Sequence, residues 1–375
     1  SDSPPHSLSA MLCTRAAMAR SLARWATAGT VGTPPRAARR VPAFGGAGDS
    51  RRVRPSPVTH GAVSHRASSS FVAASSATAS TGGKGVYDDP RTYELAFGFR
   101  EFDKEAAFLA SLSERIGTGR PPASLLELGA GPAWHSTAVA SLCPGAVAVA
   151  VDNSAPMLER ARERVAESAL NERVAVVEGD MTRLDAKACV ERAFEMAPRE
   201  SKPAVARGFD VACVLLGTAA HLVNTEDALA CLRAIHDALA PGGVAVLELE
   251  HPYDLFEGQL MDAQGDAWDR EDATRGVKVL VEWGREGDAF DVQTHVVERT
   301  VGFNVLDLAT GAPANGYAPA EEVVSCRVFT APEVDLLARL AGMRVCATYG
   351  DMNEDVPLDS EDAHNMLVVL KKDHQ

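Results

Sequence analysis

The chain has 375 residues, of which 46% are hydrophobic, and a formal net charge of −14. This length allows two domains or one large α/β domain with extensions, and it is ample for a buried core. No apolar run reaches the ~18–20 residues that span a bilayer, which argues against an integral membrane segment. The acidic balance argues against nucleic acid as a partner.

The charge divides the chain at about residue 85. Residues 1–85 carry a net charge of +9 and residues 86–375 carry −23. An Arg- and Ser-rich, acid-poor segment with an amphipathic stretch from Met11 to Trp25 is typical of an organellar transit peptide that does not fold on its own. We expect import into the mitochondrial matrix or the plastid stroma, with Met11 as the true start. A basic tail that binds nucleic acid or an acidic membrane has the same composition.

The cysteines predict neither disulfides nor a metal site. Their number, seven, is odd, and the sequence contains no CxxC and no His/Cys cluster with zinc-ligand spacing. Most lie in apolar stretches, which indicates buried free thiols.

From residue 86 onward the pattern predicts N-terminal helices over 86–118 and then an α/β sheet. Short apolar strands alternate with helices, as in a parallel sheet with right-handed crossovers. The predicted strands are Ser124–Leu128, Ala146–Val151, Arg173–Glu178, Phe209–Leu216, Val244–Glu250, Met343–Tyr349 and Met366–Lys371, with helices at Ala133–Cys143, Ala155–Ala169, Thr225–Leu239 and Ala331–Ala341.

Residues 262–329 interrupt this alternation. Val277–Trp283, Phe290–Asn304 and Val323–Phe329 are β-rich and are separated by hairpin-like gaps. We expect an antiparallel insertion that serves as a substrate lid or as the surface of a homodimer.

A Gly-rich turn follows the first predicted strand, in the sequence LLELGAGPAWHS at 125–136. Glycine lets the backbone pass close to a ligand, and the helix that follows offers free N–H donors. Trp134 stands where a dinucleotide fingerprint needs a third glycine, which argues against an NAD enzyme. Three acids, Glu127, Asp152 and Asp180, fall at the carboxyl edge of the predicted sheet, where such folds bind ligands.

Residues 86–375 resemble the class I S-adenosylmethionine-dependent methyltransferases of small molecules. The resemblance lies in ELGAGPAWHS, VAVDNSAPMLERAR, VVEGDMTRLD, FDVACVLLGTAAHL and LAPGGVAVLELEHP. It implies a Rossmann-like, mostly parallel seven-stranded sheet with an antiparallel last strand, helices on both faces and the insertion after strand five. It also implies S-adenosylmethionine as cofactor, surrounded by Glu127, Gly129, Ala130, Gly131, Asp152, Asn153, Met157, Asp180, Met181, Leu216 and Gly217.

Residues at the strand ends are candidates for the side of the methyl acceptor. His221 and Tyr253 are the candidate catalytic residues, because a base is needed where the acceptor starts protonated. Tyr93, Arg100, His251 and Tyr349 are candidate substrate residues, with Arg100 able to clamp a carboxylate. Each also has a structural interpretation: a helix cap for His221, a turn for His251, a surface ion pair for Arg100 and packing for the tyrosines.

The leading hypothesis is methyl transfer to an O, N or S atom of a small metabolite. The alternative is a non-catalytic S-adenosylmethionine-binding assembly or regulatory factor, because one fold hosts many functions.

Overall fold

The computed structural model describes residues 85–251 and 266–372. The leader up to residue 84, with Met11, and the candidate Tyr253 lie outside these ranges, so the predictions on them stay predictions. In the two described ranges, no helix is both long enough and apolar enough to cross a membrane.

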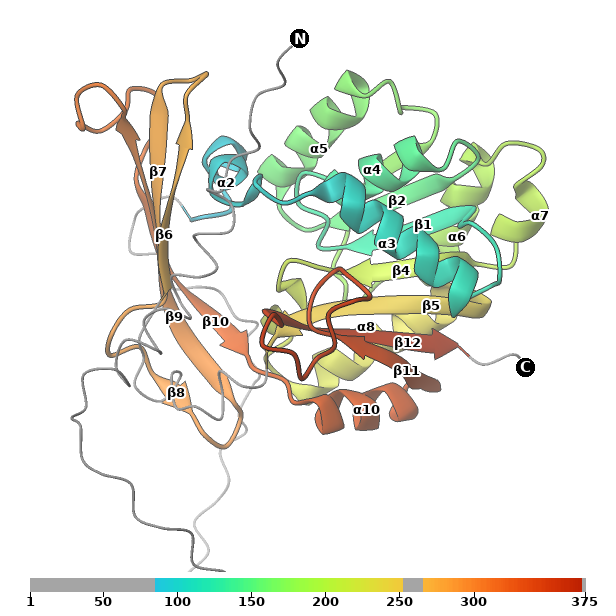
Figure 1. The fold of residues 1–375 in the computed structure, drawn as a ribbon. Helices are drawn as coiled ribbons and strands as arrows, with labels where there is room; N and C mark the ends of the chain where they lie inside the picture. Colours follow the sequence, from blue (N-terminus) through green and yellow to red (C-terminus); the bar gives the residue numbers. More distant parts are fainter. Residues whose placement is uncertain (1–84, 252–265, 373–375) are drawn as a thin grey trace, which may run out of the picture. The chain divides into compact units, whose positions relative to one another are not determined.

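A seven-stranded sheet forms the centre of the fold (Figure 1). Its strands lie in the order β11-β12-β5-β4-β1-β2-β3. The strands β1 to β5 pair in parallel, and β12 runs antiparallel to both of its neighbours. The predicted Rossmann-like sheet with an antiparallel last strand is therefore confirmed. The bounds are β1 Ser124–Leu128, β2 Val147–Asp152, β3 Val174–Glu178, β4 Phe209–Val214, β5 Leu239–Glu250, β11 Met343–Tyr349 and β12 Asn365–Lys372.

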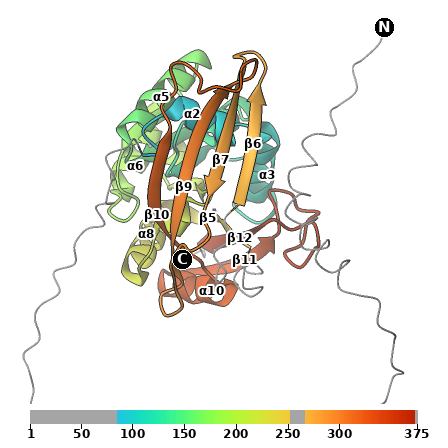
Figure 2. The same ribbon diagram turned by 90° about the vertical axis from the view of Figure 1, so that its left-hand side faces the viewer.

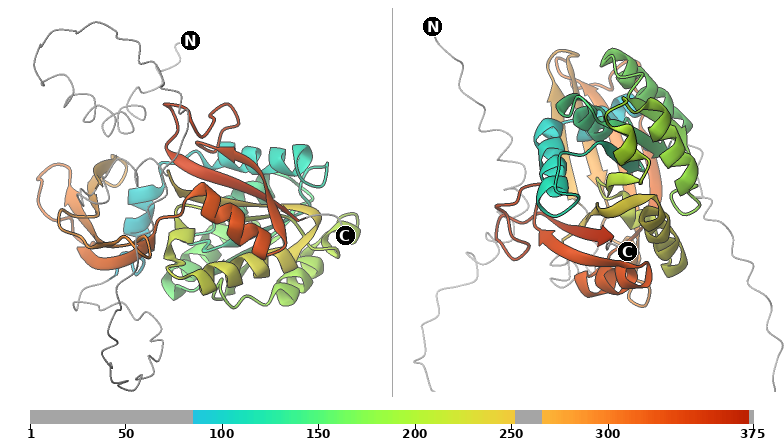
Figure 3. Two further views of the ribbon diagram at one scale, coloured as in Figure 1. Left: turned by 90° about the horizontal axis from the view of Figure 1, so that it is seen from below. Right: turned by 90° about the vertical axis from the view of Figure 1, so that its right-hand side faces the viewer.

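Helices cover both faces of this sheet (Figure 3). One face packs against α3 (Phe102–Arg115), α4 (Trp134–Leu142) and α5 (Ala155–Glu167). The other packs against α6 (Ala186–Met196), α8 (Thr225–Ala238) and α10 (Ala331–Leu340), and the short α7 (Lys202–Val205) leads into β4. Every residue of β1, β2 and β4 is buried, which explains why these strands are mostly apolar in sequence.

The alternation of side chains along the strands directs two acids to the α3 face. Glu127 lies two residues after Leu125, and Glu248 lies two residues after Val246, so each acid is on the same face of the sheet as that apolar residue. Leu125 and Val246 pack with α3. Asn365 on β12 lies two residues before Leu367 and is therefore on this face as well. Three polar side chains from neighbouring strands thus share the face that α3 covers.

The insertion forms a second sheet, with its strands side by side in the order β10-β9-β7-β6 (Figure 2). All its pairings are antiparallel, which confirms the prediction for this segment. The strands are β6 Asp266–Asp272, β7 Val277–Trp283, β8 Phe290–Asp291, β9 Val296–Asp307 and β10 Ala320–Arg327.

Two details of the insertion differ from the sequence prediction. The strand expected over Phe290–Asn304 is divided into β8 and β9, because the chain turns at His295 with a φ of 57°. The strand β6 was not predicted, since its sequence DAWDRED is dominated by charge; it lies at the edge of the sheet, where charged residues are common.

The helix α2 (Pro90–Phe97) packs against the insertion sheet and also contacts α5 (Figure 1). Its Ala96 is buried with valines of β7, β9 and β10. Two arginines of the insertion sheet reach residues around the central sheet: Arg299 pairs with Glu250 at 2.6 Å, and Arg327 pairs with Glu333. The insertion is therefore anchored next to the carboxyl edge of the central sheet.

Candidate functional site

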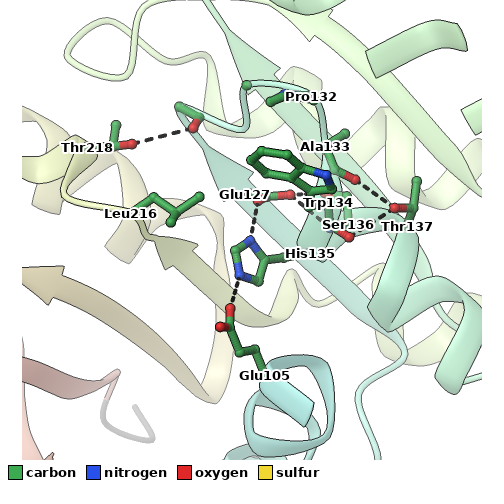
Figure 4. Close-up of polar contacts among 12 residues, drawn as sticks. Glu105, Glu127, Pro132, Ala133, Trp134, His135, Ser136, Thr137, Leu216 and Thr218 are labelled. Atoms are coloured by element: carbon green, nitrogen blue, oxygen red, sulfur yellow. Dashed lines mark hydrogen bonds and ion pairs between the residues drawn. The ribbon is translucent and has the colours of Figure 1, made fainter. Parts of the chain in front are cut away.

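The turn after β1 has an unusual backbone, with positive φ at Gly129 (62°), Gly131 (49°) and Ala133 (58°) (Figure 4). A Cβ on Gly129 would lie 2.1 Å from Cγ2 of Thr218, so packing alone requires glycine there. A Cβ on Gly131 would meet no protein atom within 4 Å, and the same holds for Gly217, whose φ is 71°. These two glycines therefore border space next to the turn rather than a packed neighbour.

Glu127 fixes the start of α4 from the strand below it. Its Oε2 accepts hydrogen bonds from the backbone N–H of Ser136 at 2.9 Å and from the Ser136 hydroxyl at 2.5 Å. Its Oε1 lies 3.0 Å from Nδ1 of His135 (Figure 4). A carboxylate at a helix N-terminus satisfies N–H groups that have no partner within the helix.

His135 is a buried cation. Its Nε2 lies 2.7 Å from Oε2 of Glu105, so both ring nitrogens face carboxylates. Carboxylates only accept, and both nitrogens can donate only when the ring is protonated. Burial alone would lower the pKa of His135, but its hydrogen bonds with Glu105 and Glu127 outweigh that effect and raise the pKa to about 9.

Arg100 links Glu105 on α3 to Glu248 on β5. Its Nε donates to Glu105 at 2.7 Å and its Nη1 donates to Glu248 at 2.6 Å. Oε2 of Glu248 in turn accepts from the backbone N–H of Leu216 at 2.8 Å. Leu216 has a φ of 54°, which is strained for a residue with a branched side chain.

Asp152 ends β2 and is only 9% exposed. One oxygen accepts from Gly131 N–H at 2.7 Å and the other from Ser154 N–H at 2.8 Å. Burial raises the pKa of Asp152, although these backbone bonds lower it in part. Each oxygen of a carboxylate can accept more than one hydrogen bond, so Asp152 retains capacity for a hydroxyl ligand.

Aromatic side chains close the site on the side of α2. Trp134 is 6% exposed and stacks on Phe102 with ring centroids 4.6 Å apart, and on Tyr93 with centroids 5.8 Å apart. The guanidinium of Arg164 lies 5.4 Å from the centroid of the Trp134 ring. Trp134 therefore packs between the turn, α2 and α3. Burial raises the pKa of Tyr93, and the charge of Asp152 raises it further, so Tyr93 stays neutral beside the acids.

His221 lies in a 3-10 helix, Thr218–His221, that follows Gly217. Its Nε2 is 3.1 Å from the hydroxyl of Tyr87, and burial lowers its pKa below the usual value. His221 is thus neutral at neutral pH, with one ring nitrogen hydrogen-bonded to Tyr87.

The other predicted site residues differ in burial and in their contacts. Met157, in the first turn of α5, is buried, whereas Asn153 is exposed. Asp180 is exposed and accepts from the N–H and hydroxyl of Thr182, and the neighbouring Met181 packs against the core. His251 bonds the carbonyl of Leu358 at 2.8 Å, and the Tyr349 ring lies edge-on to Phe108.

One comparison with known proteins covers the segment that holds the central part of this site. Residues 125–243, which include the Gly-rich turn, Asp152, Asp180 and the Leu216–Gly217 turn, match the family model described as "Methyltransferase domain". Residues 125–243 are a methyltransferase domain. This match supports an enzyme of the methyltransferase class. A search of the curated proteins found no match.

Solved structures share the fold of the methyltransferase domain together with its flanking elements. A S-adenosylmethionine-dependent methyltransferase from Clostridium acetobutylicum is 16% identical, with 75% of this chain and 95% of that chain covered and a TM-score of 0.54. The sugar N-methyltransferase KedS8 from Streptoalloteichus is 20% identical, with 81% and 98% covered and a TM-score of 0.53. CalS10 from Micromonospora echinaspora, an amino pentose methyltransferase with bound S-adenosylmethionine, is 21% identical, with 75% and 96% covered and a TM-score of 0.51. At these identities the likeness establishes a shared fold.

The residues of the methyltransferase domain fit S-adenosylmethionine. Gly131 and Gly217 lack the Cβ atoms that would fill the space beside the turn. Asp152 lies next to Gly131 with capacity for the ribose hydroxyls. The turn and the start of α4 supply a backbone on which a ligand can lie closely.

Sequence reasoning missed His135, Glu105 and Glu248 as parts of the site. Glu248 had a readable signal, because it is a charged residue inside the otherwise apolar strand VAVLELE. His135 and Glu105 lie on helices, where a polar residue is ordinary, and only their tertiary contacts reveal that they are buried.

Proposed function

We propose that this chain binds S-adenosylmethionine in the methyltransferase domain and transfers its methyl group to an O, N or S atom of a small metabolite. The observation that carries the proposal is the cradle of Gly131 and Asp152: a positive-φ glycine bordering open space, hydrogen-bonded to a carboxylate that can still accept. The match of residues 125–243 to a methyltransferase model supports the same reaction class.

The chain's residues divide the work of binding and orientation. S-adenosylmethionine supplies an electrophilic methyl group on a sulfonium, which an acceptor attacks in line. Asp152 would hold the ribose hydroxyls, and Glu127 would keep the turn and the start of α4 in one conformation. The aromatic side chains around Trp134 would exclude water, which favours a displacement whose catalysis rests mainly on alignment.

His221 is the residue we propose as proton acceptor. A base must reach the reaction in its neutral form, and burial lowers the pKa of His221 so that it is neutral at pH 7. The hydroxyl of Tyr87 would orient the ring. Tyr93 stacks on Trp134 and would line the acceptor side, while Tyr253, His251 and Tyr349 remain candidates to be tested there.

The first experiment measures cofactor binding and the second measures turnover. Calorimetry on residues 86–375 should show binding of S-adenosylmethionine and none of NAD; binding of NAD alone would overturn the proposal. A screen with methyl-labelled cofactor against an organelle extract should then label a small molecule. Binding without labelling of any component would favour the alternative of a non-catalytic factor.

A His221→Asn variant tests the proton acceptor once the screen has supplied an acceptor. We expect kcat to fall about 100-fold with cofactor affinity unchanged, in line with the usual effect of a general base. His236→Asn, on α8, is the matched control and should leave kcat unchanged. Equal rates in wild type and His221→Asn would remove this role.

Import and assembly complete the proposal. We propose that residues 1–85 direct the chain to the mitochondrial matrix or the plastid stroma and that the insertion sheet acts as a lid or a dimer surface. Imaging of a fluorescent fusion to residues 1–85 tests the first, since a cytosolic signal would contradict it. Sedimentation of wild type against Val323→Glu, on an exposed position of β10, tests the dimer.

A further inference from the structure

Four buried charged residues and the partly buried Arg100 form a continuous series of ion pairs on the α3 face of the central sheet. We call it the ion-pair chain; its members in spatial order are Glu127, His135, Glu105, Arg100 and Glu248. The contacts between successive members are 3.0, 2.7, 2.7 and 2.6 Å. No member has more than 14% of its side chain exposed.

Each end of the ion-pair chain holds a backbone N–H at the proposed cofactor site. At one end Glu127 accepts from Ser136 N–H, at the start of the helix that follows the Gly-rich turn. At the other end Glu248 accepts from the N–H of Leu216, which follows β4 and has a positive φ. The two turns also touch directly, because Thr218 packs against Gly129.

Arg100 is the member that joins the two ends. Its guanidinium spans from Glu105, which belongs to α3, to Glu248, which belongs to β5, and uses a different nitrogen for each. A planar guanidinium can hold two carboxylates in fixed directions, whereas the ammonium of lysine is a point charge. The charges of both glutamates hold the pKa of Arg100 above its usual value despite burial. The two contacts use Nε and Nη1 of the guanidinium.

We propose that Arg100 is a positioning residue that couples the Gly129–Gly131 turn to the Leu216–Gly217 turn through the ion-pair chain, so that both turns adopt their binding conformation together. The proposal rests on the proposed binding of S-adenosylmethionine between these turns. It assigns Arg100 an action through Glu105 and Glu248, without contact with the cofactor or the acceptor. Removing Arg100 would leave Glu248 buried without its cation, with only the Asn365 amide at 3.1 Å and Leu216 N–H as donors, and would loosen its hold on Leu216. The same loss would reach Ser136 through Glu105 and His135.

Amide hydrogen exchange tests the coupling without any ligand. We expect Arg100→Met to raise the exchange rates of the Leu216 and Ser136 amides at least tenfold, because both donate to the ends of the ion-pair chain. Arg100→Lys keeps the charge and should give an intermediate increase. Asp210→Asn is the matched control: it alters the ion pair of a buried acid at the opposite edge of the sheet, and it should raise both amides no more than it raises the core amides that report global unfolding. An increase at Leu216 without one at Ser136 would overturn the coupling.

Cofactor affinity gives the second test, through two substitutions that act at different points of the ion-pair chain. Glu105→Gln and Glu248→Gln should each weaken S-adenosylmethionine binding about 3–10-fold. If the two act through one coupled unit, the double variant should bind no more than about twofold more weakly than the worse single variant. Glu105→Gln combined with Asp210→Asn should simply show the effect of Glu105→Gln.

The outcomes separate this inference from the proposed function. Independent, multiplying effects of Glu105→Gln and Glu248→Gln would overturn the coupling while leaving cofactor binding intact. Wild-type protein that fails to bind S-adenosylmethionine would overturn the proposed function, and the exchange experiment would still decide whether Arg100 couples the two turns. Should Arg100→Met not fold, Arg100→Lys and Glu105→Gln supply the same comparison of the two amides.

Discussion

The two edges of the central sheet bury carboxylates in different ways. At the amino edge, Asp210 on β4 is fully buried and its oxygens accept from Ala123 N–H and from Arg120, each at 2.7 Å. Arg120 keeps 39% of its side chain exposed, so this pair ends at the surface after one step. At the carboxyl edge, Glu127 and Glu248 belong to an ion-pair chain in which no side chain is more than 14% exposed.

Backbone strain, by contrast, occurs at both edges. Ala133 and Leu216, both with positive φ although neither is glycine, lie at the carboxyl edge beside the ion-pair chain. Such conformations cost about 1–3 kcal/mol each and persist where surrounding contacts enforce them. The amino edge has Gly208, which takes a positive φ at little steric cost, and Ala169 before β3, with a φ of 55°. The comparison teaches that the two edges differ in how buried charges are linked, and that the linked charges lie at the edge where we propose cofactor binding.

Gly129→Ala should have the largest effect on stability and on cofactor binding together. Its Cβ would lie 2.1 Å from the Thr218 side chain at a φ of 62°, so we expect a loss of about 2–4 kcal/mol in the free energy of unfolding and of cofactor binding with it. Adding Thr218→Ser removes the clashing methyl group and should restore part of both. In Gly208→Ala the added Cβ would lie 2.6 Å from the backbone carbonyl of Ala238, so no shortened side chain could relieve this clash. This variant should leave the cofactor affinity of the folded protein unchanged. Full activity in Gly129→Ala would contradict this account of the turn.

The fold could be predicted largely because its signals are local. Continuous apolar strands alternating with amphipathic helices indicate a parallel sheet, and β2, for example, needs no knowledge of its neighbours to be recognised. The exceptions are equally local in cause: β6 is a charged edge strand, and the turn at His295 divides a run of strand-forming residues.

The site was predictable only where a motif fixes the backbone. Gly131 and Asp152 could be read because the turn and the end of β2 determine where both lie. Arg100 was a candidate to clamp a substrate carboxylate or to form an ion pair, and its two glutamate partners could not be named, because neither α3 nor β5 reveals in sequence that its acid points toward this arginine. Burial of a charge on a helix is decided by tertiary packing, which the periodicity of one helix does not report.

The next prediction concerns the pH dependence of unfolding, which should reflect the ion-pair chain at the carboxyl edge. The pKa of His135 is raised to about 9 in the folded chain, above its unfolded value of about 6.5. A raised pKa contributes stability that is fully present below pH ~6.5 and lost as the pH rises through about 9, a loss on the order of 3 kcal/mol. Denaturant unfolding of wild type between pH 6.5 and 9.5 should show this decline, and His135→Gln should be flatter over the same range. A wild-type profile as flat as that of the variant would show that His135 is not a buried cation.

Asp152→Ala should weaken both cofactor binding and stability. We expect S-adenosylmethionine affinity to fall about 10–100-fold, from the loss of charge-assisted hydrogen bonds. The substitution also leaves the N–H groups of Gly131 and Ser154 without their acceptor, so we expect the free energy of unfolding to fall by about 1–3 kcal/mol. Calorimetry and thermal unfolding on one preparation check both. Unchanged affinity would remove the assignment of Asp152 to the ribose.

Asp210→Asn should have the smallest effect on binding and a modest one on stability. An asparagine can accept one hydrogen bond from Ala123 or Arg120 but presents an amide donor to the other, while the half-exposed Arg120 can turn to solvent. We expect a loss of about 1–2 kcal/mol, which lowers the melting temperature by roughly 2–8 °C for a domain of this size. Cofactor affinity should stay within about twofold of wild type, because in the described residues neither Asp210 nor Arg120 contacts a member of the ion-pair chain at the opposite edge. A tenfold loss of affinity in folded Asp210→Asn would mean that β4 transmits changes along its length, and the division between the two edges would then fail.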